Sequence, residues 1–389
     1  MRPKSKHVVF TMILVILFIM LVCLQHKPKT TQTDRTEFTA DIPYFEEKYV
    51  CPEFDINLRN MEMNKLPTEY HQQSKERVDI MVFGYARGGS TYVGEIIGHH
   101  EDAFYFYEPL WTEQVALKYY HKNYICEMNS LICRYDASLD KHGYIKKLRS
   151  VYKCDMEPLV NIYVVNWQRR KSGKSWKVPP KSFNKHAILQ KMCNQSKVRV
   201  AKVLRITGDS VEEMIKINPK LKIVYLYRDP RGIVNSRLAS RKRPDWISSM
   251  GSIKQIAEGI CHKMSLDSEV LFRLKETYPR RIYIVSYETI AKYPEQSVRQ
   301  MFGFLGLSIS ERYIDYISQM GKHTGKTDKE WNSAFRSNGF ATSIKWQHEM
   351  STVNKIKIDQ SCVEVYKRLG YKSVNVNDLN NSPKNNTTS

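Results

Sequence analysis

Several patterns that define other protein classes are missing from this chain of 389 residues. Its eight cysteines include no Cys-x-x-Cys pair, which weighs against a structural zinc site. No internal repeat is present, and only one long hydrophobic run occurs, Val8–Leu24. Acidic residues are scarce, since 40 Asp and Glu stand against 61 Lys and Arg. The chain is long enough for one large domain with appendages, and it is strongly basic.

The hydrophobic run Val8–Leu24 has 17 residues without a charge, the lower limit for a spanning helix. Arg2, Lys4 and Lys6 precede it, which favours a cytoplasmic N-terminus, and no small-x-small cleavage site follows it. We therefore predict an uncleaved signal-anchor, with a cleaved signal peptide as the alternative. The short run fits the thinner membranes of the early secretory pathway. In this type II arrangement residues 1–7 are cytoplasmic, 8–24 span the membrane and the rest is luminal.

Cysteine usage agrees with an oxidising, luminal setting. Seven of the eight cysteines come after the hydrophobic run, in the part of the chain that we predict to be luminal. Because seven is an odd number, at least one of them is unpaired or bonded to another chain. Cys126 with Cys133 and Cys154 with Cys193 are the disulfides that we predict. Glycosylation sequons consistent with a luminal protein begin at Asn194, Asn380, Asn385 and Asn386.

The formal net charge of +21 attracts polyanions and raises their rate of encounter. Nucleic acid does not fit a luminal protein, so an anionic nucleotide donor and an acidic glycan suit the setting better. A solvated lysine-rich surface without a ligand is the alternative. The stretch Asn166–Lys185 has seven Lys and Arg, no acid, and two tryptophans, Trp167 and Trp176. It is either a basic arm along a sulfated or uronic-acid chain or a flexible surface insertion, and the sequence leaves both open.

The order of polar and apolar segments predicts one folded domain on a stalk. Residues 25–75 are polar and form a luminal stem, and residues 76–372 form the domain. Residues 373–389 have no apolar face and are predicted to be disordered.

Strand-like and helical segments alternate within the predicted domain. This order predicts an α/β fold with a mainly parallel sheet covered by helices on both faces. Helices are expected over 294–305 and 360–369, ended by Gly306 and Gly370. The predicted strands are Val78–Tyr85, Phe104–Tyr107, Val198–Ile206, Leu221–Tyr227 and Arg281–Tyr287.

The first strand leads into a turn with the shape of a phosphate-binding loop. Val78–Tyr92 reads VDIMVFGYARGGSTY, an apolar strand followed by three glycines and the start of a helix. Such a turn aims backbone N–H groups and the helix dipole at an anion. A nucleoside-triphosphate loop would have lysine in place of Ser90, and the only cation of this loop is Arg87. The pattern predicts a donor without a γ-phosphate, hence sulfuryl rather than phosphoryl transfer, and argues against a P-loop kinase.

The predicted strand Leu221–Tyr227 ends in a second candidate anion site. Arg228 follows the strand directly, and Ser236 lies about two helical turns further on, so both side chains can meet one phosphate. A plain strand-end salt bridge of Arg228 is the alternative. Because the carboxyl ends of parallel strands share one edge of the sheet, the two sites suit a nucleotide phosphorylated at both ends of its ribose.

The two motifs resemble those of Golgi carbohydrate sulfotransferases. YARGGSTYVGEII followed by DAFYFYEPLW is similar to the 5′-phosphosulfate loop of that family, and VYLYRDPRGIVNSR is similar to its 3′-phosphate motif. The similarity runs from about residue 78 to 372. Within the family, the chain is similar to the branch that transfers sulfate to the 6-hydroxyl of Gal, GalNAc or GlcNAc. It implies a sulfotransferase fold, with a P-loop-type, mainly parallel sheet flanked by helices, and a location in the Golgi membrane. It also implies 3′-phosphoadenosine-5′-phosphosulfate (PAPS) as the donor, without a metal.

The resemblance assigns roles to residues of both motifs. Arg87 would lie against the sulfuryl group and offset the charge that builds on the leaving phosphate. Loop amides would hold the 5′-phosphate, and Arg228 with Ser236 would hold the 3′-phosphate. Gly88 and Thr91 stand where the family usually has serines, so a side-chain role at position 88 is lost. The predicted donor-binding residues are Ala86, Arg87, Gly88, Gly89, Ser90, Thr91, Tyr92, Arg228, Asp229, Pro230, Arg231 and Ser236.

The reaction also needs a group that takes the proton of the acceptor hydroxyl. Glu108, after the segment FYFY, is the predicted catalytic base, because related sulfotransferases use a carboxylate after the second strand. A plain surface acid is the alternative reading of Glu108. His99 and His100 are rivals, since cytosolic sulfotransferases use histidine, but they follow the first helix and fit its C-terminal cap better.

The acceptor is predicted as a class, an acidic or neutral glycan such as chondroitin, keratan or a chain with GlcNAc or Gal. No nucleic-acid partner is expected, the membrane is contacted through the N-terminal helix, and a homodimer is left open. The alternative function is a membrane-tethered, inactive protein that binds polyanionic glycans. Candidate acceptor contacts are Trp331, Phe335, Arg336, Trp346, Arg237, Arg241, Lys242 and Arg243.

Overall fold

The computed structural model describes residues 76–111, 118–136, 141–166, 176–177, 183–239, 251–320 and 339–374. All of them belong to the unit Pro52–Ser389. The predicted anchor, the stem and nearly all of the C-terminal tail lie outside these ranges. None of the helices within the ranges combines the length and apolar character that crossing a bilayer requires.

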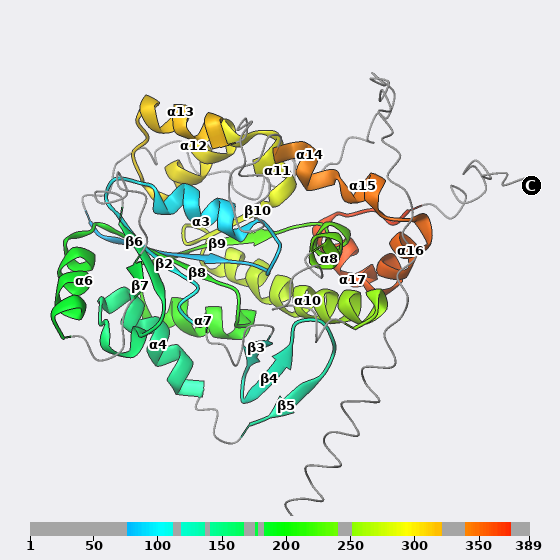
Figure 1. Cartoon of the computed structure of the whole chain (residues 1–389), viewed down its shortest axis with the longest axis horizontal. Coiled ribbons are helices and arrows are strands. Elements are labelled where there is room, and N and C mark those ends of the chain that lie inside the picture. The colour runs from blue at the N-terminus through cyan, green and yellow to red at the C-terminus, as the bar shows by residue number, and fades with distance from the viewer. Residues whose placement is uncertain are drawn as a thin grey trace, which may run out of the picture. The chain divides into compact units, whose positions relative to one another are not determined.

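A seven-stranded sheet forms the centre of the described domain, in the order β10-β9-β1-β8-β2-β6-β7 (Figure 1). The strands from β10 to β2 run parallel, whereas β6 and β7 pair antiparallel at one edge. The predicted strands are the parallel ones, so the mainly parallel α/β sheet is confirmed, while the antiparallel edge is absent from the prediction. The strands are β1 (Val78–Phe83), β2 (Ala103–Tyr107), β6 (Tyr163–Asn166), β7 (Trp176–Lys177), β8 (Val198–Val203), β9 (Leu221–Tyr227) and β10 (Ile282–Ser286).

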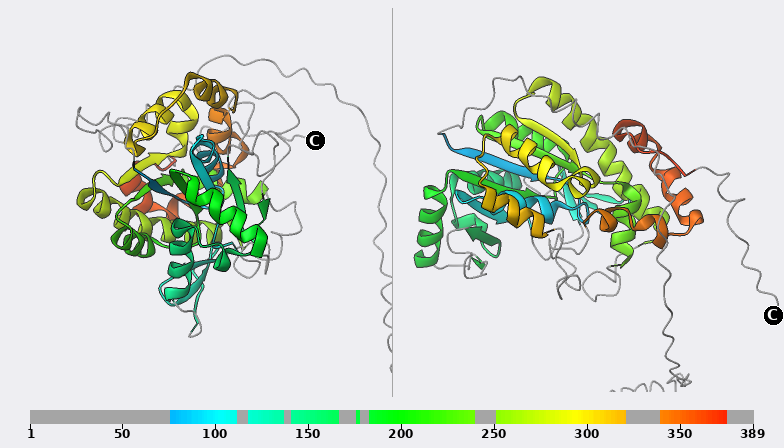
Figure 2. Two further views of the ribbon diagram at one scale, coloured as in Figure 1. Left: turned by 90° about the vertical axis from the view of Figure 1, so that its left-hand side faces the viewer. Right: turned by 90° about the horizontal axis from the view of Figure 1, so that it is seen from above.

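Helices cover both faces of this sheet (Figure 2). One face carries α3 (Ser90–Gly98), α11 (Tyr287–Lys292), α12 (Pro294–Leu305) and α13 (Glu311–Met320). The other carries α4 (Lys141–Lys153), α6 (Phe183–Gln195), α7 (Gly208–Ile217), α8 (Pro230–Ala239), α10 (Ile253–Thr277), α16 (Thr352–Ser361) and α17 (Val363–Leu369). Smaller elements are β3 (Lys118–His121), β4 (Tyr124–Glu127) and β5 (Cys133–Tyr135), which form a second sheet, and η2 (Glu157–Leu159), α14 (Gly339–Ile344) and α15 (Trp346–Glu349).

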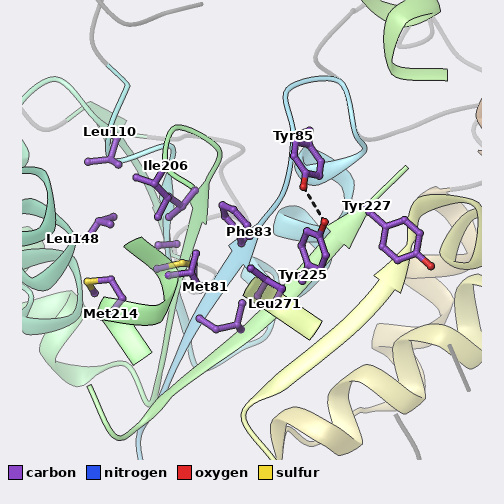
Figure 3. Packing of buried hydrophobic residues seen from close by; sticks show 14 of the residues in the cluster. Met81, Phe83, Tyr85, Leu110, Leu148, Ile206, Met214, Tyr225, Tyr227 and Leu271 are labelled. Carbon is purple, nitrogen blue, oxygen red and sulfur yellow. Dashed lines mark hydrogen bonds between the residues drawn. The ribbon is translucent and has the colours of Figure 1, made fainter. Parts of the chain in front are cut away.

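The central strand β1 is buried along its whole length and divides its side chains between two cores. Ile80 and Val82 pack with the helices α3 and α12, whereas Met81 and Phe83 pack with α7 and α10 (Figure 3). Each such buried side chain stabilises the fold by roughly 1.5–3 kcal/mol. The continuous apolar run of β1 is therefore required by burial on both faces, and it holds the following loop on a rigid base.

Several predicted chain features are confirmed at the ends of helices. The helices α12 and α17 end at Gly306 and Gly370, which have φ angles of 76° and 80°, the left-handed region that favours glycine. The predicted helix over 360–369 begins later than expected, at Val363, because Cys362 separates α16 from α17.

Three disulfides link the described elements. The predicted Cys126–Cys133 and Cys154–Cys193 pairs are confirmed, and the pair of Cys261 and Cys362 is additional. The additional disulfide joins α10 to the junction of α16 and α17, across a sequence separation of 101 residues. It fixes the C-terminal helices to the longest helix of the described domain.

Candidate active site

The loop between β1 and α3 presents bare backbone at the start of a helix. Gly89 is the N-cap of α3 with a φ of 89°, and a Cβ at this position would collide with the ring of Tyr287. The first amides of α3 have no partner inside the helix, so they can bind an anion. Arg87 also lies in the left-handed region, with a φ of 71°. A non-glycine residue in this conformation is strained, so the surrounding contacts must hold it there.

The two predicted phosphate motifs meet at Arg87. Its Nε donates a hydrogen bond to Ser236 Oγ on α8 at 3.0 Å. Its carbonyl oxygen accepts one from Arg228 Nη1, also at 3.0 Å. The residues predicted to contact opposite ends of a nucleotide are therefore joined at the carboxyl ends of the neighbouring strands β1 and β9.

Arg228 is buried and held from several sides. Its Nη2 donates to the carbonyl oxygens of Thr342 and Ser343 at 3.3 and 3.2 Å, and its guanidinium lies 4.8 Å from the centre of the Tyr287 ring. Its Nε is buried and has no hydrogen-bond partner among the described residues. The simple strand-end salt bridge considered for Arg228 is not formed among those residues, whose carbonyl groups hold it instead.

The residues after Arg228 support the turn with their side chains. Arg231 forms ion pairs with Asp229 at 2.8 Å and with Asp359 at 3.4 Å, and its guanidinium lies 4.3 Å from the ring centre of Trp346. Pro230 begins α8. Trp346 is buried, so this candidate acceptor contact packs inside the domain.

Arg237 corrects the sequence-based view of the cations after the second motif. It was expected to face an anionic group of the acceptor, yet it is buried on α8. Its Nη1 donates to Met128 O and Asn129 Oδ1, each at 2.7 Å, and its Nη2 to Ala86 O at 3.5 Å. Burial, with a smaller effect of Arg87, lowers the pKa of Arg237 to about 10. The side chain connects the loop between β1 and α3, which we call the donor loop, to the turn between β4 and β5. The other candidate acceptor contacts lie outside the described residues: Arg241, Lys242, Arg243, Trp331, Phe335 and Arg336.

Glu108 follows β2 and is enclosed by two cations. Its Oε1 lies 3.0 Å from Lys202 Nζ and its Oε2 lies 2.9 Å from Arg205 Nη2. Burial would raise the pKa of Glu108, but the charges of Lys202 and Arg205 outweigh it and hold the pKa below its usual value. Glu108 also has a positive φ of 44°. It is therefore an ionised, buried carboxylate in a constrained backbone, and not a plain surface acid.

Lys202 links the carboxylate to the donor loop. Its Nζ donates to Thr91 Oγ1 at 3.2 Å and lies 3.4 Å from the centre of the Tyr107 ring. Arg205 stacks over Trp111, with its central carbon 4.5 Å from the ring centre. Sequence reasoning missed both cations, although two charges three residues apart in the apolar segment VAKVLRI were a signal.

The two histidines lie at the other end of α3 from the loop, a helix length of roughly 13 Å. His99 is the C-cap of α3; its Nδ1 contacts Glu95 O at 2.6 Å and its Nε2 contacts the Tyr316 hydroxyl at 2.7 Å. His100 is buried, which lowers its pKa, and Asp102 N donates to its Nδ1 at 3.2 Å. Both side chains pack at the α12–α13 side, where they complete the end of the helix.

Glu288 is a further acid beside the second motif, and the sequence analysis did not identify it. Its Oε1 accepts from Asp229 N at 3.1 Å and its Oε2 accepts from the Tyr371 hydroxyl at 3.2 Å. Burial raises the pKa of Glu288 to about 7, although the charge of Arg228 opposes this shift. The carboxyl group therefore holds the backbone at Asp229, directly after Arg228, and is about half protonated near pH 7.

The donor-loop residues that remain are placed as follows. Ser90 is the first, buried residue of α3, and Gly88 N donates to Tyr85 O at 2.9 Å. Tyr92 packs edge-on against Tyr287, with ring centres 6.4 Å apart, and burial raises its pKa. Within the described ranges, no three His, Cys, Asp or Glu side chains are grouped so as to hold a metal ion.

Comparison with known proteins gives a consistent match. A family model described as "Sulfotransferase domain" matches residues 77–370. Carbohydrate sulfotransferase 6 of Homo sapiens is 22% identical over 342 residues, covering 77% of this chain and 82% of the relative. Carbohydrate sulfotransferase 1 of Danio rerio is 22% identical over 351 residues, covering 79% and 80%. Among solved structures, mouse sulfotransferase SULT7A1 complexed with PAP aligns at a TM-score of 0.37 and 14% identity, covering 77% of this chain and 90% of that one.

Proposed function

The chain belongs to the sulfotransferase domain family, and on this premise we propose that it transfers a sulfuryl group from PAPS to a hydroxyl of a glycan. The names of the carbohydrate sulfotransferases that it resembles support the acceptor class. One observation carries the proposal. The Arg87–Ser236–Arg228 cluster and the Lys202–Glu108 pair are joined to one loop, at the carboxyl edge of a parallel sheet.

The residues around the loop fit a donor with two anionic ends. The bare amides at Gly89 and the start of α3 suit the 5′-phosphate, because no Cβ stands in the way. Arg228 has a buried Nε–H that finds no acceptor within the described residues, and Ser236 supplies a hydroxyl, so both suit the 3′-phosphate. When bound, PAPS supplies an activated sulfuryl group. Arg87 is placed to offset the negative charge of the departing phosphate.

Glu108 is the group that we propose takes the proton of the acceptor hydroxyl. Its lowered pKa keeps it ionised, and a carboxylate retains acceptor sites beyond those used by Lys202 and Arg205. The cations fix its position, since proton transfer requires hydrogen-bond distance to the acceptor. His99 and His100 are engaged at the far end of α3, which favours Glu108 over either histidine as the base.

Finer assignments extend the proposal. The motif resemblance supports the 6-hydroxyl of Gal, GalNAc or GlcNAc as the acceptor group. We place the catalytic domain in the Golgi lumen, behind a type II anchor at Val8–Leu24, since carbohydrate sulfation and the sequence pattern both fit that compartment.

The test is sulfate transfer by the full-length protein in detergent, with radiolabelled PAPS. The acceptors are chondroitin, desulfated keratan and GlcNAc-terminated oligosaccharides. Arg87→Ala is expected to lower kcat about 10²–10³-fold, the usual cost of losing one charge-stabilising donor. Arg273→Ala is the matched control, because Arg273 is an exposed arginine on α10 paired with Glu212 at 2.7 Å.

The outcomes separate the alternatives. Label on one acceptor class, lost in Arg87→Ala and retained in Arg273→Ala, supports the enzyme and identifies its acceptor. Thermal stabilisation by the donor without label on any of the three acceptors contradicts the proposed acceptor set. Absence of both label and donor binding overturns the catalytic proposal in favour of an inactive glycan-binding protein.

A further inference from the structure

The positive charge of the chain is concentrated in one region. Residues 118–208 contain 20 Lys and Arg against five Asp and Glu, a balance of +15 within a total of +21. No acid occurs at all between residues 158 and 208. About a quarter of the sequence therefore carries most of the net charge. A lysine-rich surface that served solubility alone would spread this charge more evenly along the chain.

The helix α4 displays part of this charge as a stripe. Lys146, Arg149 and Lys153 are exposed and spaced three and four residues apart, so they share one side of the helix over roughly 10 Å. The other side, with Leu148 and Tyr152, is buried in the core. The helix contains no acid, and within the described part of the chain none of these three cations forms an ion pair.

The helix α6 continues the basic surface. It also contains no acid, and its Lys185 and Lys191 are exposed. The disulfide Cys154–Cys193, with its Cα atoms 5.7 Å apart, joins the end of α4 to the last turn of α6. Figure 1 shows both helices at the same end of the large sheet, beside β6 and β7. We call Lys146, Arg149, Lys153, Lys185 and Lys191 the α4–α6 basic surface.

A short series of contacts connects α4, the helix that carries the stripe, to the candidate base. Arg205, which holds Glu108, accepts a hydrogen bond at its carbonyl oxygen from Tyr120 N at 2.8 Å. The Tyr120 ring stacks on Tyr144 of α4, with centres 4.8 Å apart. Lys146 follows Tyr144 by two residues in the sequence. The basic stripe thus begins near the active edge of the sheet and leads away from it along α4.

We propose that the α4–α6 basic surface binds the anionic part of a glycan chain whose acceptor sugar lies at Glu108. The inference rests on the proposed function and specifies its substrate: a polymer with carboxylate or sulfate groups beyond the reacting sugar. Unpaired cations in a row complement such a chain and raise its local concentration. The nearest acids in sequence after the stripe, Asp155 and Glu157, lie past the end of α4 and interrupt no part of it.

The test compares two triple variants of the full-length protein in detergent. Lys146→Gln, Arg149→Gln and Lys153→Gln together remove the stripe. Lys357→Gln, Lys367→Gln and Lys372→Gln remove the same charge from exposed positions of the C-terminal segment. KM and kcat are measured with chondroitin sulfate and with a short uncharged acceptor. Binding of fluorescent chondroitin sulfate is measured in parallel over a series of salt concentrations.

The stripe variant is expected to raise KM for the polymer about tenfold or more, with kcat unchanged and a weaker salt dependence of binding. The short acceptor and the control variant should show no such change. Equal KM values for the wild type and both variants would overturn the proposal. An equal rise of KM for the polymer in the control variant would also overturn it. Selective loss of binding to phosphatidylserine vesicles would assign the surface to a membrane instead. If the wild type labels no acceptor, the proposed function fails. The binding of fluorescent chondroitin sulfate to the wild type and the two variants still tests whether the α4–α6 basic surface binds the polymer.

Discussion

Lys202 Nζ lies 3.0 Å from Glu108 Oε1 and 3.2 Å from Thr91 Oγ1, so one ammonium group contacts both the candidate base and the donor loop. This geometry makes the base and the donor site interdependent. Any anion bound at the loop competes with Glu108 for the same charge. The state of the base should therefore depend on Lys202, which can be tested by titration.

Lys202→Met is expected to move the acidic limb of the pH–rate profile upward by about one unit or more. The reason is that Lys202 lowers the pKa of Glu108, and the base works only when ionised. Removing the cation raises that pKa, so activity disappears at a higher pH as the solution is acidified. The measurement is kcat against pH with saturating donor.

Lys202→Arg is the control, since it retains a cation beside Glu108. Its acidic limb should stay close to that of the wild type even if kcat falls. An acidic limb that does not move in Lys202→Met would show that Glu108 is not the group that titrates in the profile.

Gly89→Ala should abolish donor binding, because the new methyl group meets the Tyr287 ring and the φ of 89° is unfavourable for alanine. Gly303→Ala, in the last turn of α12, is the matched substitution. Apart from the neighbouring backbone of α12 itself, no described atom lies within 4 Å of a Cβ at that position, so this change should stabilise the protein by about 0.5–1 kcal/mol through helix propensity. Isothermal titration with 3′-phosphoadenosine-5′-phosphate, the product that PAPS leaves, measures nucleotide affinity. Thermal unfolding measures the change in stability. Normal affinity in Gly89→Ala would contradict the assigned loop.

Loss of the Cys261–Cys362 disulfide should destabilise the domain more than loss of Cys126–Cys133. In the chain-entropy account, closing a loop of about 100 residues contributes about 4.7 kcal/mol, and closing one of about seven residues contributes roughly half as much. The two pairs have sequence separations of 101 and 7. Paired Cys→Ala variants, compared by thermal unfolding midpoints, test the order. The reverse order would mean that packing around the β4–β5 hairpin dominates.

The stability of the wild type should fall as the pH rises from about 4.5 to about 7, in part because of Glu288. The pKa of this carboxyl group is raised from 4.5 to about 7, so in that window the folded state holds a proton that the unfolded state has released. Glu288→Gln removes this slope and should gain stability relative to the wild type above pH 7. Thermal midpoints across the pH range provide the measurement. Glu364→Gln, an exposed acid on α17, should leave the slope unchanged.

Most of the sheet and the donor loop were predictable because their signals are local. The parallel strands are buried on both faces, so β1 and β9 contain the apolar runs Ile80–Phe83 and Ile223–Tyr227. The strand β7 has only two residues, Trp176 and Lys177, and carries no such signal. The loop was identified from adjacent residues, whereas the hydrogen bond from its Arg87 to Ser236 of the second motif, at 3.0 Å, was not predicted.

The remaining site depends on contacts between distant segments. Lys202 reaches Glu108 only because β8 lies between β1 and β2, a pairing that no short motif specifies. Arg237 was misassigned for the same reason, since its partner Met128 lies 109 residues earlier in the chain. A charged side chain on a predicted helix reads as exposed until the segment that covers it is known.

The pairing of β1 with β8 also determines when the site comes into existence. Val78 stands opposite Val198, so the strand that ends in the donor loop and the strand that carries Lys202 are 120 positions apart in the chain. Closing so long a connection has an entropic cost, and non-local pairings of this kind slow folding. A nascent chain that has not paired these strands lacks the contact between Lys202 and Thr91 of the loop. We therefore expect the proposed nucleotide donor to bind only molecules that have paired these strands, and its binding to protect them from unfolding by mass action.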